Sequence, residues 1–290
     1  MNQTANTYRL IAFPMLILMV FTLIPTVLGM GLSLFDWAGG SDMPRYVGLA
    51  HFRAMASEET MGFALVNTLG YVALSVPPTI VLAFLLAVAV DADWFVGRAV
   101  VRAVIFMPTI VSIVAIGFVW RWVLDDQSGL LSSGLRAAGV ADPPNWLIDG
   151  RWPMLWIILV SVWRGVGFCL VLYLAALASV NRNLYEAAAI DGASRSQVLR
   201  YITWPSVRPM TLFLTITTVI AALQVFDLVY IMTPGKENQY TTVLNLYLYR
   251  QFSDFANFGY AAAIGVVIFG ITLLVTAGQL GWVRLRGQTV

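Results

Sequence analysis

The sequence predicts an all-α fold: a polytopic membrane protein with six transmembrane helices and a helix–turn–helix loop on the cytoplasmic side. Of its 290 residues, 59% are hydrophobic and only 11% are charged, whereas a soluble domain carries about a quarter charged residues. Apolar runs of more than 18 residues recur along the chain, and each is long enough to cross a bilayer core of about 30 Å. Between two of these runs, residues 183–209 carry signals for short helices.

The predicted spans form a single membrane domain over residues 1–290. They cover residues 10–34, 63–90, 99–120, 153–180, 210–232 and 259–283. The first span is expected to be an uncleaved anchor, because its apolar run exceeds the core of a signal peptide, which is about 7–15 residues. Pro77 and Pro78 are expected to interrupt the second span, and Pro108 lies within the third. Residues 49–57 favour a short surface helix.

The polar segment at residues 183–209 begins with signals for a short helix. Asn183 is expected to cap this helix, and Glu186, three residues later, would complete a capping box. The three alanines at 187–189 favour helix. Gly192 provides the left-handed backbone conformation that ends a helix.

A second short helix is expected to follow at once. Ser194 and Gln197 repeat the capping-box spacing, and Pro205 and Pro209 are expected to stop the helix and turn the chain. The result would be a helix–glycine–helix projection between two spans. Its shape suits docking into a cleft on another protein.

The distribution of charge orients the chain in the membrane. With the amino terminus in the cytoplasm, the inner segments hold most arginines and the outer segments most acids, which is the positive-inside pattern. The inner arginines are Arg9, Arg98, Arg102, Arg182, Arg195, Arg200, Arg208, Arg284 and Arg286. The outer acids are Asp36, Asp42, Glu58, Glu59, Asp125, Asp126, Asp142, Asp149, Glu237 and Asp254. Both termini and residues 183–209 are therefore expected on the cytoplasmic side.

Polar residues inside the spans are candidates for solute contact. Arg164 lies in the middle of the fourth span, where a charge costs several kcal/mol unless it faces protein or water. It either offers its fork of donors to a ligand or pairs with Asp227 in the fifth span. Gln224 is expected on the same helix face as Asp227, where it would bond a solute hydroxyl or a neighbouring helix. Phe168 would stack on a ligand ring or pack against helices.

The residue sets of common enzyme sites are missing from the sequence. There is no GxxxxGK[ST] phosphate-binding loop. The single cysteine, Cys169, excludes an intrachain disulfide and a cysteine-rich metal site. The single histidine, His51, has no ligand cluster near it in the sequence and is expected in an outer loop, so it supplies no Ser/His/Asp set inside the membrane. The net charge of +2 gives no indication of nucleic-acid binding. A secondary transporter remains an alternative, although Asp227 is the only candidate for its ion site. A membrane scaffold is another.

The polar segment is similar to the EAA loop of permease subunits of ATP-binding-cassette (ABC) importers. The matching positions are Glu186, Ala187, Ala188, Asp191, Gly192, Ala193, Gln197, Ile202, Pro205 and Pro209. Leu199 and Trp204 depart from the pattern, which has an aromatic residue and a leucine there. The resemblance implies that residues 183–209, hereafter the coupling segment, seat in a groove of a partner ATPase. All the matching positions except Ile202 and Pro209 are expected to couple the permease to this ATPase.

Further motifs resemble carbohydrate-importer permeases, in particular the subunit that corresponds to the larger membrane protein of the maltose transporter. They are Phe35-Asp36-Trp37, Val47-Gly48-Leu49 with Phe52, Asn67-Thr68, Phe106-Met107-Pro108, Trp120-Arg121-Trp122 and Gln224-Val225-Phe226-Asp227. By position, this resemblance implies sugar contacts at Thr109, Ser161, Arg164, Gly165, Phe168, Thr218, Ala221 and Ala222. The last two alanines stand where that relative has an aromatic residue and an amide, and Arg164 where it has an aliphatic residue. The expected solute is therefore not a maltooligosaccharide held in the same way.

The resemblance also implies an assembly in the plasma (inner) membrane of a bacterium. The expected partners are a second homologous permease, two ATPase subunits and an extracytoplasmic solute-binding protein. ATP and Mg²⁺ would be bound by the ATPase, so no cofactor is expected in this chain, which would be a translocator and not an enzyme. Its expected role is half of a pathway that imports a sugar or sugar-like solute by alternating access.

Overall fold

The computed structural model describes residues 11–40, 43–91, 97–233 and 238–285, except the side chain of Arg284. The helices are α2 (Ile24–Leu32), α3 (Ala50–Ser57), α4 (Glu59–Asp91), α5 (Arg98–Ile110), α6 (Ile113–Val123), α7 (Leu130–Ala137), α8 (Trp152–Ala178), α9 (Arg182–Ile190), α10 (Arg195–Val198), α11 (Trp204–Leu223), α12 (Asp227–Met232), α13 (Leu244–Ser253) and α14 (Phe258–Leu285). The described residues also form two π-helical turns, η1 (Met19–Leu23) and η2 (Leu199–Thr203), and two short antiparallel strands, β1 (Phe35–Asp36) and β2 (Arg45–Tyr46). The prediction of an all-α fold is confirmed.

Five described helices are long and apolar enough to cross a membrane. They are Ile11–Leu32, Glu59–Asp91, Trp152–Ala178, Arg195–Leu223 and Phe258–Val283. A sixth span arises if α5 and α6 are taken together, although the two helices are bent by 96° at a short break. The polytopic character is thus confirmed. Leu10, at the start of the first predicted span, and the charged residues Arg9, Asp42, Glu237 and Arg286 lie outside the described residues.

The third predicted span, residues 99–120, is broken. Val111 and Ser112 separate α5 from α6 with extended backbone, at ψ angles of 141° and 133°. A β-branched residue and a serine both compete poorly for helical conformation. Pro108 lies inside α5 and not at the break.

The prolines that were expected to interrupt or stop helices lie inside them. α4 continues through Pro77 and Pro78, and the helix Arg195–Leu223 runs through Pro205 and Pro209. The prediction that the last two prolines end the second short helix of the coupling segment is therefore wrong. The π turn η2 lies just before Pro205, and such a turn shifts the hydrogen-bonding register, which accommodates a residue without an N–H.

The fifth predicted span, residues 210–232, ends earlier than expected. α11 stops at Leu223, and α12 begins as a separate helix at Asp227. Gln224 and Asp227 therefore do not share one helix face, contrary to the prediction. α12 packs against α6, so the helices that follow the two breaks contact each other.

Contacts between residues divide the chain into two compact units. One comprises residues 1–62 and 244–273, and the other comprises residues 63–243 and 274–290. The assignment of residues 1–290 to a single membrane domain stays a prediction.

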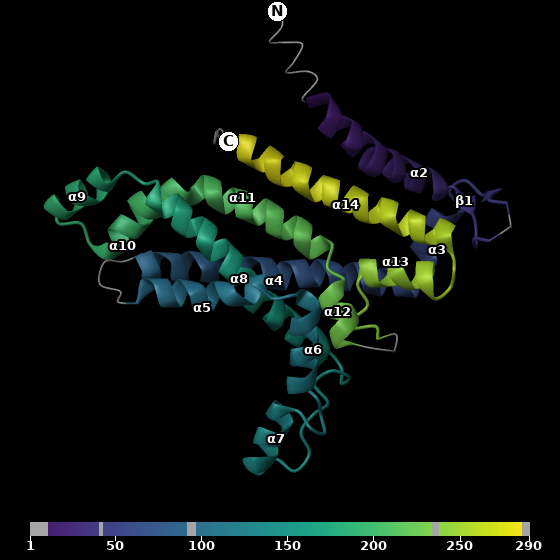
Figure 1. Ribbon diagram of the computed structural model, residues 1–290, viewed down its shortest axis with the longest axis horizontal. Coiled ribbons are helices and arrows are strands. Elements are labelled where there is room, and N and C mark those ends of the chain that lie inside the picture. The colour runs from purple at the N-terminus through teal and green to yellow at the C-terminus, as the bar shows by residue number, and fades with distance from the viewer. Residues whose placement is uncertain (1–10, 41–42, 92–96, 234–237, 286–290) are drawn as a thin grey trace, which may run out of the picture. The chain divides into compact units, whose positions relative to one another are not determined.

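In the larger unit, α8 contacts both α5 and α11 (Figure 1). Gly167 permits the close approach of α5, because a Cβ at that position would lie 2.5 Å from the main-chain oxygen of Ile105. Tyr173 of α8 is fully buried and packs edge-on against Phe84 of α4. It also donates a hydrogen bond of 3.0 Å to the hydroxyl of Thr211 on α11. α8 is thereby connected to three neighbouring helices.

In the smaller unit, α14 is anchored at its first residues. The N–H of Phe258 donates to the main-chain oxygen of Trp37 at 3.0 Å. Glu58 accepts hydrogen bonds from the hydroxyls of Tyr247 on α13 and Tyr260 on α14. The short helix expected at residues 49–57 is present as α3. α7 and α13 lie in segments for which no helix was predicted.

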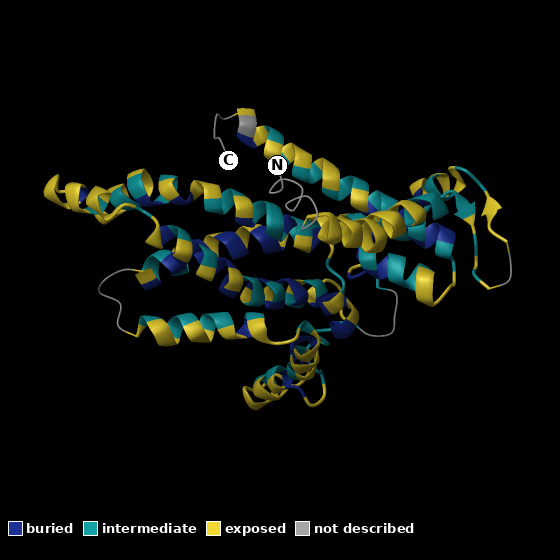
Figure 2. Ribbon diagram, turned by 45° about the horizontal axis from the view of Figure 1, so that its top comes forward, coloured by how far each residue is buried: buried dark blue, intermediate teal, exposed yellow. Residues whose placement is uncertain are grey.

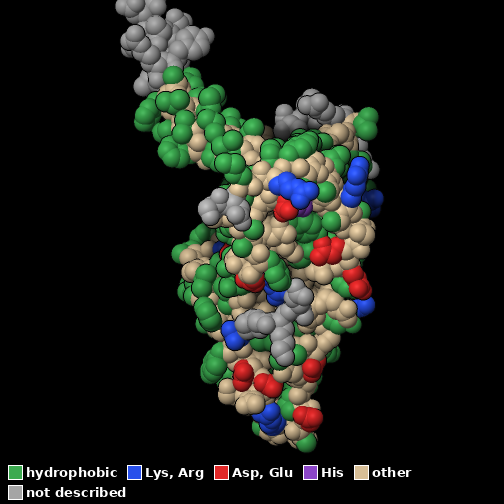
Figure 3. Space-filling model, turned by 90° about the vertical axis from the view of Figure 1, so that its right-hand side faces the viewer, with side chains coloured by type: hydrophobic (Ala, Val, Ile, Leu, Met, Phe, Trp, Pro, Cys, Tyr) green, Lys and Arg blue, Asp and Glu red, His purple; other side chains and the backbone are tan. Residues whose placement is uncertain are grey.

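The helix Ile11–Leu32 has no buried residue in its most apolar window. It is coloured mostly as exposed in Figure 2, and hydrophobic side chains cover it in Figure 3. Phe21, for example, is 76% exposed. A surface of this kind is stable only against hydrocarbon or against another protein.

Candidate functional site

One face of α8 carries four of the predicted contact residues. Arg164 and Gly165 follow Ser161 by three and four residues, and Phe168 follows them by four and three. This spacing places the four residues along one helix face, hereafter the α8 stripe. Ser161 and Arg164 are half-buried, and Phe168 is 47% exposed. The structure therefore aligns a hydroxyl, a guanidinium and an aromatic ring within a membrane span.

Tyr71 of α4 joins the α8 stripe, although the sequence reasoning did not select it. Its hydroxyl donates to the hydroxyl of Ser161 at 2.8 Å, and its side chain is buried. The sequence feature that could have identified Tyr71 is a tyrosine within an apolar run, because a buried phenol usually has a hydrogen-bond partner.

The side chain of Arg164 makes no hydrogen bond or ion pair with any residue that the structure describes. No ion pair joins it to Asp227, which is exposed at the start of α12. Its Nε is buried and has no acceptor among the described residues. The structure thus gives no support to the alternative that Arg164 pairs with Asp227. The guanidinium keeps its donors available.

Two further contacts place neighbouring helices against the α8 stripe. The hydroxyl of Thr109 on α5 donates to the main-chain oxygen of Arg164 at 3.1 Å. A Cβ on Gly165 would lie 3.1 Å from the methyl group of Thr79 on α4. Gly165 was expected to contact the sugar. In the structure it lets α4 approach α8.

The predicted contact residues near the end of α11 have different surroundings. The hydroxyl of Thr218 lies 4.0 Å from the Cys169 sulfur on α8. Ala222 is buried, whereas Ala221 and Gln224 are exposed. Among the described residues, no hydrogen bond connects these α11 positions to Ser161 or to the Arg164 side chain. Their solute contacts stay predictions.

The first helix of the coupling segment, α9, begins two residues earlier than predicted. Its N-cap is Asn181, whose side chain accepts a hydrogen bond of 3.0 Å from the N–H of Asn183. The capping box of Asn183 with Glu186 is therefore wrong, because Asn183 already lies inside the helix. Asn181, two residues upstream, has the same side chain and caps the helix in place of Asn183.

The turn after α9 has the predicted geometry. Gly192 has a φ of +70°, the left-handed conformation in which glycine commonly follows a helix. The N–H groups of Gly192 and Ala193 donate back to Ala189 and Ala188 at 3.2 and 2.9 Å. These bonds pair carbonyl oxygens in the last turn of α9 that have no hydrogen-bond donor within the helix.

The capping box of the second short helix, α10, is confirmed. The Ser194 side chain accepts from the N–H of Gln197, and the Gln197 side chain accepts from the N–H of Ser194 at 2.7 Å. Local side-chain chemistry at this position agreed with the tertiary structure, so the helix starts where the sequence predicts.

The outer surface of the coupling segment is open. Glu186, Ala187, Asp191, Gly192 and Gln197 are exposed, while Ala193 and Pro205 are half-buried and Ala188 is buried. Ile190 is 87% exposed. A large apolar side chain next to exposed polar groups, on a helix pair beyond the ends of α8 and α11 (Figure 1), forms a surface suited to a partner protein.

No group of three or more histidine, cysteine, aspartate or glutamate side chains in the described residues is arranged to hold a metal ion. The chemistry that the arrangement offers is binding. Hydroxyls, a guanidinium and an aromatic ring line the α8 stripe, and a capped helix pair projects from the ends of two spans.

The membrane-spanning helices, the polar residues inside one of them and the exposed helix pair define the chain as a polytopic membrane transport component. The chain belongs to the family described as binding-protein-dependent transport system inner membrane components, which its residues 71–280 match.

Two characterised relatives and one solved structure illustrate the similarity. The chain is 32% identical over 267 residues to the lactose transport system permease protein LacF of Rhizobium radiobacter, covering 91% of this chain and 89% of that one. It is 33% identical over 276 residues to the diacetylchitobiose uptake system permease protein NgcF of Streptomyces coelicolor, covering 91% and 78%. A chain of a bacterial alginate ABC transporter, solved with an alginate pentasaccharide-bound periplasmic protein, superposes with a TM-score of 0.86 at 25% identity, covering 97% and 95%.

Proposed function

We propose that this chain is a permease subunit of an ABC importer and forms half of the translocation pathway for a saccharide or saccharide-like solute. The observation that carries the proposal is the α8 stripe, a row of hydrogen-bonding and aromatic side chains inside a membrane span. The relatives support the choice of solute class, since their names refer to lactose, diacetylchitobiose and alginate.

Each side chain of the α8 stripe has a distinct role in this proposal. Arg164 donates to solute hydroxyl or carboxylate oxygens, because its guanidinium has donors without acceptors among the described residues. The half-exposed ring of Phe168 stacks on a sugar ring. Thr109 donates its hydrogen to the main-chain oxygen of Arg164, so its oxygen offers a lone pair to the solute. Ser161 accepts from Tyr71, so its own hydrogen is available to donate to the solute. Thr218, Ala221, Ala222 and Gln224 provide further solute contacts in this proposal.

The coupling segment connects the pathway to ATP hydrolysis in this proposal. Two ATPase subunits bind ATP and Mg²⁺, and one of them receives α9 and α10 in a groove. Closure of the ATPases moves the coupling segment, and the spans alternate between inward-open and outward-open states. The exposed side chains of Glu186 and Ile190 provide the contact. A second permease completes the pathway, and an extracytoplasmic binding protein delivers the solute.

The proposed orientation follows from the positive-inside pattern. The chain lies in the plasma (inner) membrane of a bacterium with both termini and the coupling segment in the cytoplasm. A secondary transporter is the rival function. It would require an intramembrane ion site, and its one candidate acid, Asp227, is exposed at a helix start.

Reconstitution of the complete complex with its binding protein in proteoliposomes tests the proposal. Uptake of labelled lactose, diacetylchitobiose and a panel of other saccharides should require ATP inside the vesicles. Arg164→Ala should lower the apparent affinity about ten- to a hundredfold, which corresponds to the loss of a charge-assisted hydrogen bond of about 1.5–3 kcal/mol. Leu159→Ala, an exposed position on the same helix, is the matched control and should leave uptake unchanged.

The same assay separates the rival functions. Uptake that follows an ion gradient without ATP would establish a secondary transporter. ATP-driven uptake of another solute class, with no response to any saccharide, would remove the saccharide assignment while keeping the importer.

A further inference from the structure

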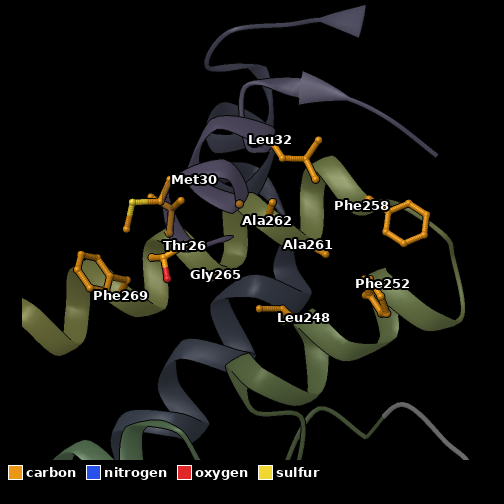
Figure 4. Close-up of a pocket in the computed structure, with 12 residues that line it drawn as sticks. Thr26, Met30, Leu32, Leu248, Phe252, Phe258, Ala261, Ala262, Gly265 and Phe269 are labelled. Carbon is orange, nitrogen blue, oxygen red and sulfur yellow. The ribbon is translucent and has the colours of Figure 1, made fainter. Parts of the chain in front are cut away.

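The hollow between α2, α13 and α14 in the smaller unit does not suit a polar solute (Figure 4). Its volume is about 350 Å³, and Thr26 has the only polar side chain among its lining residues. The Thr26 hydroxyl already donates to the main-chain oxygen of Thr22 at 2.6 Å. A solute with hydroxyls or charge would leave them unpaired there, which is unfavourable. The α8 stripe in the larger unit is different, because it contains a cation.

Arg164 lies far from both ends of its helix. It is near the middle of α8, roughly 18–21 Å from either end at 1.5 Å per residue. Its side chain therefore cannot reach the aqueous surface by extending along the helix. A guanidinium is not deprotonated in proteins, so the charge persists. A charge at that depth faces protein, water or a bound ligand.

The helices that pack on α8 supply no acid to balance this charge. As far as the structure describes them, α5, α6, α8 and α11 contain no aspartate or glutamate. The acids of α4 are its first and last residues, Glu59 and Asp91, and Asp91 lies 3.9 Å from Arg102. The acid of α12 is Asp227, which is exposed. The α8 stripe therefore has a positive charge that no described side chain balances.

The hydroxyls around Arg164 also leave its guanidinium open. Thr109 donates to the main-chain oxygen of Arg164 at 3.1 Å, and Tyr71 donates to Ser161 at 2.8 Å. A solute that enters the stripe displaces water from the guanidinium, and a neutral hydroxyl compensates only part of that loss. A carboxylate or phosphate compensates more, because it cancels the charge and accepts two parallel N–H bonds from the donor fork.

On the basis of the importer function proposed above, we infer that the solute is an anionic saccharide whose carboxylate or phosphate group binds Arg164. Phe168 lies four residues beyond Arg164 on the same face, about 6 Å along the helix. A sugar ring stacked on Phe168 therefore places an acidic substituent at the guanidinium, as a uronic acid or a sugar phosphate would. Ser161, on the other side of Arg164, donates to a hydroxyl of the same solute.

Uptake of matched solutes by the complete complex with its binding protein, in proteoliposomes, tests this assignment. Each neutral disaccharide of a panel has two counterparts, in which one hydroxymethyl group is oxidised to a carboxylate or esterified with phosphate. The anion preference is the ratio of kcat/KM for the charged solute to kcat/KM for its neutral counterpart. The wild-type chain should prefer a charged solute about tenfold or more. Comparison of the two charged series identifies which group Arg164 binds.

Substitutions of Arg164 should change the anion preference itself. Arg164→Gln removes the charge but keeps donors, and should lower the preference about tenfold or more. Arg164→Lys keeps the charge and should retain part of the preference. Phe168→Leu is the matched control, because it removes stacking and should reduce uptake of both solutes alike. The binding protein is the same throughout, so its own selectivity cancels between variants.

Two results would overturn the assignment while leaving the importer intact. One is ATP-driven uptake in which the neutral disaccharides are preferred or equal to their charged counterparts. The other is an anion preference that is the same in the wild-type chain and in Arg164→Gln. Where Arg164→Gln fails to accumulate in the membrane, Arg164→Met provides this comparison, since its side chain needs no hydrogen-bond partner.

The same measurements distinguish failure of the assignment from failure of the proposed function. Uptake driven by an ion gradient without ATP, with an anion preference that depends on Arg164, would contradict the ABC importer and support the anionic saccharide. ATP-driven uptake confined to solutes that are not saccharides would overturn both.

Discussion

The hydroxyl of Tyr71 on α4 donates a hydrogen bond of 2.8 Å to the hydroxyl of Ser161 on α8. This bond connects a buried side chain to the first residue of the α8 stripe. The position of the Ser161 oxygen is thereby tied to α4, and α4 also contacts α8 where Thr79 meets Gly165. A movement of α4 relative to α8 would move a proposed solute ligand.

We expect Tyr71→Phe and Ser161→Ala to weaken transport by similar factors. Each change removes the same interhelical hydrogen bond, which is worth about 0.6 kcal/mol on average within membranes. The double variant should be little worse than the single ones, because the second change removes nothing more. Apparent KM values for uptake, measured for all four proteins, check this. Fully additive effects would contradict a shared function for the pair.

The absence of an ion pair between Arg164 and Asp227 leads to a second prediction. Arg164→Lys should reduce transport strongly, because an ammonium cannot reproduce the donor fork of a guanidinium. Asp227→Ala should be milder, and the double variant should equal the sum of the two effects. A thermodynamic cycle on uptake and on complex stability measures this. Strong coupling between the two positions would restore a paired role for Arg164.

Gly192→Val should uncouple the permease from its ATPase while leaving it in the membrane. Gly192 has a φ of +70°, and a non-glycine residue in the left-handed region costs about 1–3 kcal/mol. Solute-stimulated ATPase activity is the measurement. Gly139→Val is the matched control, because Gly139 has a φ of +97° with nothing near its Cβ but lies in the segment after α7. The prediction fails if both variants lose coupling equally.

The orientation is tested by cysteine labelling in a chain whose buried native Cys169 is replaced by alanine. Ser196 of the coupling segment and Ser133 of α7 are both exposed. A cysteine at position 133 should react with an impermeant maleimide in intact spheroplasts, and one at position 196 only after permeabilisation. The neighbouring Ser132 is unsuitable, because it is fully buried. The reverse pattern would invert the topology.

Glu58 should stabilise the smaller unit through its two tyrosine donors. Tyr247→Phe and Tyr260→Phe each remove a hydrogen bond to a charged group, worth about 1.5–3 kcal/mol, and each should lower the melting temperature of the complex. Tyr46→Phe, at a position that is 67% exposed, is the control. An unchanged melting temperature in both Glu58-partner variants would show that the hydrogen bonds are not stabilising.

The same cluster predicts a dependence on pH. Burial, together with the hydrogen bond to Glu58, raises the pKa of Tyr247 above its ordinary value. A raised pKa means that the folded state favours the neutral phenol. The stabilisation is therefore complete below the ordinary tyrosine pKa of about 10 and is lost as the pH rises through the raised value. Melting temperatures at increasing alkaline pH should converge for the wild-type chain and Tyr247→Phe.

Much of the coupling segment could be predicted because its chemistry is local. The capping box of Ser194 and Gln197 and the left-handed glycine at position 192 involve residues at most a few positions apart. The start of α9 was misplaced for the same reason: Asn181 and Asn183 are equivalent as side chains, and only the packed helix decides which of them precedes it.

By itself, the sequence determined that the chain spans a membrane several times, since length and apolar composition suffice for that conclusion. It also placed Arg164 in the middle of a span, which is α8 in the structure. The tertiary structure alone decided that the third span breaks at Val111 and Ser112 and that Arg164 does not pair with Asp227. It alone decided that Tyr71 meets Ser161. Residues 71 and 161 are far apart in the chain, and contacts of that kind depend on how helices pack, which no local pattern records.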